Sequence, residues 1–497
     1  MIRPLACFLG LLATALPAVR AQAQADPPPP KVIEIRPMAA PVPALKYRLL
    51  PERRDLIVGN AAVFYHRAIE MVQGVRMGQL TQALATKQSP ADLAKVGETI
   101  QQWSSGPLRE IPREEARKHL ETYRNALHEV ELGARRETCD WEFDRRQEGF
   151  SLLLSDIQES RTLGRLVALQ VRFEILEGRP EGAIHWLETG FALARHVARG
   201  TTLVQSLVGM AITGQMFVVL EELIQAPGTP NLTWALAGFP RPMIDLTPAL
   251  EGEFYMLERE FPRLKDLDSE PWSLDQARSF SREMQRELAK LTGMWTPVEA
   301  GSDLTMKDWG SQLSFTAMVA RGYPEAKRSL IARGRPASQV EAMPAIQAVA
   351  LSSYRRYEEI RDELFKWANV PYAQARRGLD EAARRISACQ QDKYQGIPFV
   401  AVLPAIRSVF VAQIRTDRQL EVIQCIEAIR LYAAAHGGAL PPSLEAISEA
   451  PAPLDSATGK PFEYKVGDDS AMLTAPIFPG APNHPAFEIR YELKPVR

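Results

Sequence analysis

Residues 160–226 read SRTLGRLVALQVRFEILEGRPEGAIHWLETGFALARHVARGTTLVQSLVGMAITGQMFVVLEELIQA. Apolar side chains recur there at spacings of three and four, as they do along one face of an α-helix. Breaks at Gly178 to Pro180 and at Gly200 divide the stretch into three helices, and the second is apolar on two sides. A helix with two apolar sides packs between neighbours, so this stretch predicts stacked helical hairpins.

Most of the surrounding chain has the same helical period. It predicts an N-terminal helical domain over residues 59–245 and a second helical region over residues 246–395. Residues 262–310 are poorer in apolar side chains and hold Pro271 and Pro297, which predicts a long loop or lid. Residues 355–363 interleave arginine with acidic residues beside an apolar stripe, a pattern typical of a solvated helix face.

The last hundred residues have a different character. A helix is expected through Tyr432 and should end at the Gly437-Gly438 pair. Two short strand patterns, 462–466 and 471–474, flank a Gly-Asp-Asp turn, and residues 487–493 predict a third strand. The predicted fold class is therefore mostly α. Irregular, solenoid-like stacked helical hairpins are joined to a small C-terminal α+β module with a short antiparallel sheet.

The hairpin stretch weakly resembles a tetratricopeptide repeat. The spacing of the second half of such a repeat falls on Gly178, Ala183, Leu187 and Gly190. The first half does not match, because its positions fall on Val167, Val171 and Glu174, and no second copy follows at a fixed period. The resemblance implies tetratricopeptide-like packing of one hairpin.

Residues 396–497 resemble the soluble part of type II secretion pseudopilins. They share a Leu-Pro-x-x-Leu-like step at Leu440, an Asp-x-x-x-Gly-x-Pro loop from Asp455, and a Phe-x-Tyr strand at Phe462. Pilins carry their membrane helix at the extreme N-terminus, whereas this region is internal, and Ala401 stands where the pilin glutamate would fall. The resemblance implies a borrowed module. As a whole, the chain resembles large exported helical families of planctomycete-type bacteria.

The N-terminus has the pattern of a signal peptide over residues 1–25. Arg3 precedes an apolar run, and Ala21 to Ala25 offer small-x-small cleavage sites. The run is shorter than the roughly 20 apolar residues that a membrane span requires, so we expect cleavage, with a retained anchor as the alternative. Proline-rich residues 26–58 predict a tether in which Val32–Ile35 and Tyr47–Leu50 could dock as strands. We expect an exported protein of the periplasm or cell envelope.

Composition argues against several classes of partner. The 497 residues are 46% apolar and 24% charged, which is ordinary for a globular protein. The net charge of −1 gives no electrostatic reason to expect nucleic acid, and no membrane span is expected after signal cleavage. Outside the signal peptide lie Cys139, Cys389 and Cys425, which we expect to be buried thiols, with a Cys389–Cys425 disulfide as the alternative.

Motifs for catalysis or cofactors are absent from the sequence. His185 and His196 share a helix face but lie about 16 Å apart along its axis, too far for one metal. No His-Glu-x-x-His or Glu-x-x-His occurs, and Thr458-Gly459-Lys460 lacks the upstream glycine of a phosphate loop, because Leu454 occupies that place. We therefore assign no catalytic residue, cofactor or metal.

The densest mixture of aromatic and charged groups runs from Cys139 to Phe150. On one interpretation it is an interaction surface or a carboxylate pair. On the other, Trp141 and Phe143 anchor the core while the arginines pair with nearby acids. The candidate interaction surface consists of Asp140, Trp141, Glu142, Asp144, Arg145 and Arg146.

Three functional hypotheses follow. The first is a non-enzymatic scaffold or interaction protein whose partner is another envelope protein, because export and helical hairpins occur without catalytic motifs. The second is a component of a secretion or pilus-like assembly, which rests on the C-terminal module alone. The third is an enzyme of unrecognised type, for which the Cys139 to Glu148 segment would be the first place to search.

Overall fold

The computed structural model describes residues 29–496 apart from 86–101, 105, 142–153, 293–305, 368–369, 392–395 and 404. Contacts divide the described residues into two units. Unit 1 holds those within Leu250–Ser408, and unit 2 holds those within Ala21–Phe143, Leu153–Ala249 and Val409–Arg497. The predicted signal peptide lies outside the described residues.

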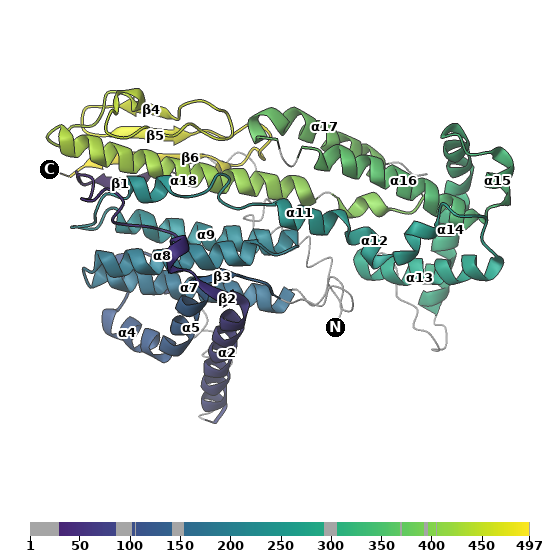
Figure 1. The fold of residues 1–497 in the computed structure, drawn as a ribbon, viewed down its shortest axis with the longest axis horizontal. Coiled ribbons are helices and arrows are strands. Elements are labelled where there is room, and N and C mark those ends of the chain that lie inside the picture. Colours follow the sequence, from purple (N-terminus) through teal and green to yellow (C-terminus); the bar gives the residue numbers. More distant parts are fainter. Residues whose placement is uncertain are drawn as a thin grey trace. The chain divides into compact units, whose positions relative to one another are not determined.

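Three stacked helices form the centre of unit 2 (Figure 1). They are α7 (Leu154–Leu176), α8 (Pro180–Ala198) and α9 (Leu203–Leu223), as the apolar spacing predicts. Glycine allows their close approach, because a Cβ added at Gly209 would lie 2.5 Å from the Cβ of Ala198. The mostly α fold is confirmed.

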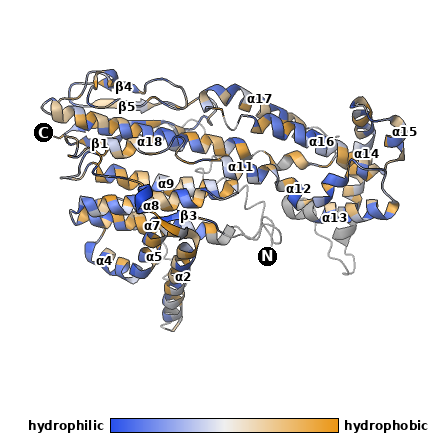
Figure 2. Cartoon of the chain, viewed as in Figure 1, coloured by the Kyte–Doolittle hydropathy of each residue, from blue (hydrophilic) through white to orange (hydrophobic). Residues whose placement is uncertain are grey.

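One helix of this stack, α9, is long and apolar enough to cross a membrane by length and composition alone. Much of it is buried against α7 and α8, and Figure 2 shows this stack rich in hydrophobic residues. The same length and composition are found in core helices, and α9 packs as one.

Further helices of unit 2 surround the stack. They are α2 (Ala61–Ala85), α4 (Arg113–Thr122), α5 (Arg124–Ala134) and the short α10 (Thr233–Ala237). Two short parallel strands, β2 (Ile57–Asn60) and β3 (Arg136–Thr138), pair beside α2. The side chain of Asn60 accepts a hydrogen bond from the Ala62 N–H at 3.1 Å and so caps the start of α2.

A four-stranded sheet completes unit 2, in the order β1-β6-β5-β4. The strands are β1 (Lys31–Ile35), β4 (Glu463–Val466), β5 (Ala471–Ala475) and β6 (Ile489–Pro495). The three C-terminal strands are antiparallel and confirm the predicted sheet. Its partner is the long helix α18 (Ala405–Ala435), from which the Gln419 amide donates to the Tyr491 hydroxyl at 2.6 Å. The relationship to pseudopilins itself stays a prediction.

The N-terminal tether contributes one strand to this sheet. β1 confirms the strand expected at Val32–Ile35 and runs parallel to β6. The strand expected at Tyr47–Leu50 is wrong: these residues form no strand, and Leu49 is buried without one.

Unit 1 is helical in the described residues. It contains α12 (Met256–Glu260), α13 (Leu274–Thr292), α14 (Met306–Ala332), α15 (Ala337–Ala342), α16 (Ala345–Phe365) and α17 (Tyr372–Gln391), while α11 (Thr247–Phe254) spans the division between the units. The long loop expected over 262–310 is wrong, because α13 lies within it. Among residues 274–286 of α13, whose side chains the structure describes, Ala277, Phe280, Met284 and Gln285 are buried.

None of Cys139, Cys389 and Cys425 forms a disulfide. Cys389 and Cys425 are both buried, as expected from the residue type, whereas Cys139 is only half-buried, so the expectation is wrong for that residue. The disulfide alternative is therefore wrong.

Candidate binding pocket

Of the Cys139 to Phe150 segment, the structure describes residues 139–141. Trp141 is buried and stacks on Tyr65, with ring centroids 5.9 Å apart. The neighbouring Asp140 is fixed through its backbone, whose N–H donates to the side chain of Asn60 at 2.8 Å. Trp141 therefore anchors the core. The other members, Glu142, Asp144, Arg145 and Arg146, lie outside the described residues.

A buried histidine, a buried tyrosine and a half-buried cysteine lie close to this tryptophan. The Tyr65 hydroxyl and Nδ1 of His196 are 2.8 Å apart. Burial lowers the pKa of His196 to about 3, so the ring is neutral at ordinary pH. Burial raises the pKa of the Cys139 thiol to about 12, which keeps it protonated and unreactive. These groups are structural and provide no activated nucleophile.

A second histidine, His185, lies in a network of charges on α5 and α8. Its Nε2 is 2.8 Å from Oε1 of Glu131, and Arg135 bridges to Glu188 at 3.3 Å. The hydrogen bond with His185 lowers the pKa of the Glu131 carboxyl. Across the described part of the chain, no group of three or more His, Cys, Asp or Glu side chains could hold a metal ion.

Three arginines are fully buried in unit 2, and each is paired with an acid. Arg172 pairs with Glu222 at 2.7 Å, Arg418 with Asp455 at 3.0 Å, and Arg430 with Glu427 at 2.5 Å. Each guanidinium also donates to backbone carbonyls of distant loops, such as Trp103, Pro476 and Thr229. A buried pair that satisfies loop carbonyls fixes chain segments in place, so these charges serve the fold.

Two further acids lie four residues apart on α18. Asp417 accepts the Met243 N–H at 2.8 Å, and Glu421 accepts the Ser456 N–H at 3.0 Å. Burial raises the pKa of Asp417 to about 6 and that of Glu421 to about 7. Both carboxyls are buried and accept hydrogen bonds from the backbone of loops.

The charges of unit 1 are arranged differently, because several of them line a pocket of about 610 Å³. The pocket lies between α14 and α16. Its charged lining consists of Arg321, Glu325, Arg328, Arg333, Arg356 and Glu359. Three serines, Ser329, Ser352 and Ser353, add hydroxyl groups. The volume is in the range of small-molecule sites.

Both glutamates of the pocket form ion pairs with arginines of the lining. Arg333 binds Glu359 through two guanidinium nitrogens, and its Nη2 lies 3.1 Å from Oε2. This hydrogen bonding raises the pKa of Arg333, which stays charged. Arg328 pairs with Glu325 at 2.5 Å on the same helix. Arginines outnumber glutamates in this lining by four to two.

Glycine shapes one wall of the pocket. A Cβ added at Gly322 would lie 3.1 Å from the Cα of Gly396, so α14 and the backbone after α17 approach closely. Gly396 has a φ of +74°, which favours glycine. Next to it, the Ile397 N–H donates to the Ser353 hydroxyl at 3.0 Å. The wall is thus held by close backbone packing against α14 and by a hydrogen bond to a side chain of α16.

The sequence interpretation missed this pocket. Residues 355–363 have the alternation of a solvated face, and much of the charged lining comes from another helix, α14. The local signal that was present is the density of arginine in 321–335.

No protein-family model, curated protein or solved structure matches the chain. The resemblances to tetratricopeptide and pseudopilin modules therefore stay predictions.

Proposed function

We propose that this protein is an exported, non-enzymatic binding protein of the cell envelope, and that the α14–α16 pocket binds a small anionic ligand. The observation that carries the proposal is the pocket itself, with four arginines around about 610 Å³. Guanidinium groups are planar forks that bind carboxylate or phosphate oxygens in pairs.

The composition of the lining favours a negatively charged ligand. Arginines outnumber glutamates there by four to two, and carboxylate or phosphate oxygens are the groups that guanidinium binds best. The serine hydroxyls could donate to further oxygens. A phosphate ester or a dicarboxylate has this chemistry.

The export part of the proposal rests on the N-terminal sequence. The basic residue, apolar run and small-x-small sites over residues 1–25 support secretion to the periplasm or envelope. The ligand would then be one that reaches that compartment.

A thermal-shift screen tests the proposal. The full mature chain is heated with inorganic phosphate, pyrophosphate, citrate or succinate, and with chloride at matched ionic strength. A ligand at 100 times its Kd stabilises the native state by about 2.7 kcal/mol, which raises Tm measurably. If no anion shifts Tm relative to chloride, the pocket is not an anion site.

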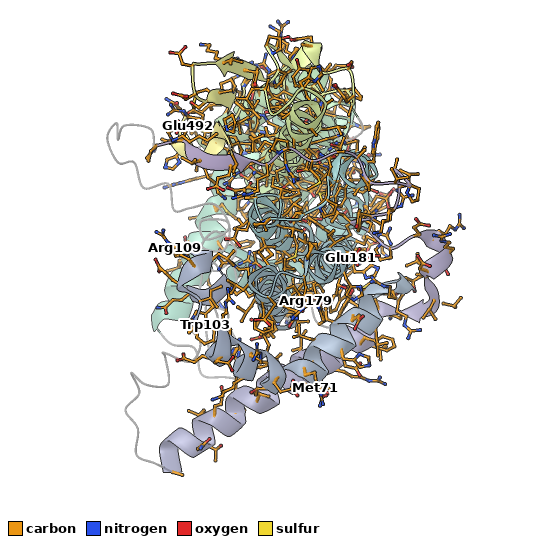
Figure 3. All side chains as sticks on the ribbon, turned by 90° about the vertical axis from the view of Figure 1, so that its left-hand side faces the viewer. Met71, Trp103, Arg109, Arg179, Glu181 and Glu492 are labelled. Carbon is orange, nitrogen blue, oxygen red and sulfur yellow. The ribbon has the colours of Figure 1, made fainter. Side chains whose placement is uncertain are left out.

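A second candidate function is docking to an envelope protein. Helix α2 extends away from the helical stack, as Figures 1 and 3 both show, and Met71 and Met77 are exposed on it. A Cβ added at Gly74 or Gly78 would meet no other described part of the chain within 4 Å, so another helix could approach the backbone there. This favours a helix of an envelope partner as the ligand of α2.

Crosslinking and affinity capture from the envelope fraction test the docking role. One stoichiometric partner should be captured by the wild type and by Leu454→Glu, a matched change at an exposed apolar residue of the C-terminal module. The partner should be lost with Met71→Glu/Met77→Glu. Equal capture by all three proteins would remove α2 as the docking helix.

A further inference from the structure

The first described strand of the chain lies beside the last. β1 pairs with the edge of β6 in parallel, so that Ile33 lies opposite Leu493 and Ile35 opposite Pro495. Ile33 and Ile35 are fully buried, whereas Val32 beside them is exposed. Without β1, the edge of β6 would be open and the core beneath it uncovered. Figure 3, in which Glu492 marks β6, shows the two strands together.

Helix α9 and the turn that follows it add polar contacts to β1. Lys31 forms an ion pair with Glu221, a nearly buried acid of α9. The Glu34 N–H donates to Oε1 of Gln225 at 3.1 Å, and Arg36 Nε donates to the Gln225 carbonyl at 2.7 Å. These contacts recognise a basic residue at the start of the strand and an arginine after it.

The backbone beyond β1 is held by α18. Arg430 Nε donates to the Arg36 carbonyl at 3.1 Å, and the Met38 N–H donates to the Arg430 carbonyl at 3.3 Å. Arg430 is itself buried and paired with Glu427. The groove formed by β6, α9 and α18 therefore binds residues 31–38 as it would bind an extended peptide.

The connection that follows this segment is exposed, and Lys46 at its end pairs with Glu181 at 3.1 Å. Residues 42–46 are exposed, and Val42 is 92% exposed. Pro41 and Pro43 stiffen the connection. It therefore resembles a hinge between a bound strand and the rest of unit 2.

We infer that the edge of β6 is a strand-acceptor site, and that β1 of a second copy of this chain can occupy it in place of the chain's own β1. Residues 31–38 of one copy can make the same contacts with β6, α9 and α18 of the other copy, so the exchange needs no new interface. Only the backbone conformation of the hinge differs. Exchange of an identical element in this way is a low-cost route to a dimer. The inference is independent of the anion pocket, which lies in unit 1.

The test uses the full mature chain with a protease recognition sequence inserted between Val42 and Pro43. The protein is refolded over a series of concentrations, and the molar mass is measured by light scattering after size exclusion. A dimer should accumulate as the concentration rises. Cleavage of the inserted site should then halve the molar mass of this dimer. After cleavage, each copy holds the other copy's β1 without a covalent link between the two.

Peptide exchange provides the second measurement. A labelled peptide of residues 29–40 should replace the cleaved strand and raise fluorescence anisotropy, while the same peptide with Ile33→Asp and Ile35→Asp should not. A protein that is monomeric at every refolding concentration overturns the inference, as does a dimer that keeps its mass after cleavage. Equal binding of both peptides would also overturn it.

Discussion

Arg418 and Asp455 form a two-point ion pair inside unit 2, in which Nε donates to Oδ1 and Nη2 to Oδ2, both at 3.0 Å. Their side chains are only 1% and 4% exposed. The same carboxylate accepts the Ala457 N–H at 2.9 Å. One arginine of α18 thereby fixes the start of the Asp455 to Pro461 loop.

Removal of the acid from this pair should destabilise the protein strongly. Asp455→Asn leaves the Arg418 charge buried without its counter-ion, which typically costs about 3–5 kcal/mol. Urea denaturation followed by circular dichroism measures the free energy of unfolding. Arg384→Gln, which removes an exposed pair with Glu381, is the control and should leave the midpoint unchanged. Equal effects of the two changes would contradict a structural role for the buried pair.

Asp417 and Glu421 should contribute less to the free energy of unfolding as pH rises from about 4.5 to 7. Burial raises both pKa values in the folded state, so the folded state binds more protons than the unfolded state over this interval. The raised pKa of each carboxyl corresponds to a change of roughly 3 kcal/mol in the free energy of unfolding over this interval. The difference in unfolding free energy between the wild type and Asp417→Asn/Glu421→Gln should follow this slope. A difference that is constant with pH would show that the two carboxyls titrate normally.

Two glycines of the same helix should respond in opposite directions to alanine. At Gly209 a Cβ would meet the Ala198 Cβ at 2.5 Å and the Ala194 carbonyl at 2.6 Å, so Gly209→Ala should cost about 1–3 kcal/mol. At Gly214 a Cβ would meet no other described part of the chain within 4 Å, so Gly214→Ala should stabilise α9 by about 0.5–1 kcal/mol. Thermal unfolding of both variants measures the difference. Similar shifts in Tm would contradict the packing of α8 against α9.

The cysteines should be unreactive in the native protein. Burial raises the pKa of both Cys139 and Cys425, so little thiolate exists at pH 8. Ellman's reagent should label the native chain slowly and label it fully in urea. Because Cys7 lies in the predicted signal peptide, protein purified from the envelope should show three thiols. A count of four would mean that the signal is retained.

Much of the fold follows from local patterns. The three central helices and the C-terminal hairpin each depend on residues close together in the sequence, and both are observed. The pairing of β1 with β6 joins Lys31 to Tyr491 at the opposite end of the chain, and no local periodicity encodes that partner. Helix α13 was missed because the sequence around it is poor in apolar residues and holds Pro271 and Pro297.

Local sequence patterns could not predict the pocket either, because its lining comes from separate helices. Arg321 and Arg356 belong to different helices, and each looks like an ordinary solvated charge in its own segment. Only the packing of α14 on α16 brings them to one cavity. Of the predicted surface segment, Trp141 is buried, so its aromatic ring indicated core packing rather than a contact surface.

The most direct test of the proposed function is calorimetric titration of the full chain with pyrophosphate, citrate and succinate. The account predicts that at least one of these anions binds the wild type and Arg384→Gln equally. Arg321→Gln/Arg356→Gln should weaken that binding at least tenfold while its far-UV circular dichroism stays that of the wild type. Absence of binding to the wild type, or unchanged affinity in the double variant, would contradict an anion site between α14 and α16.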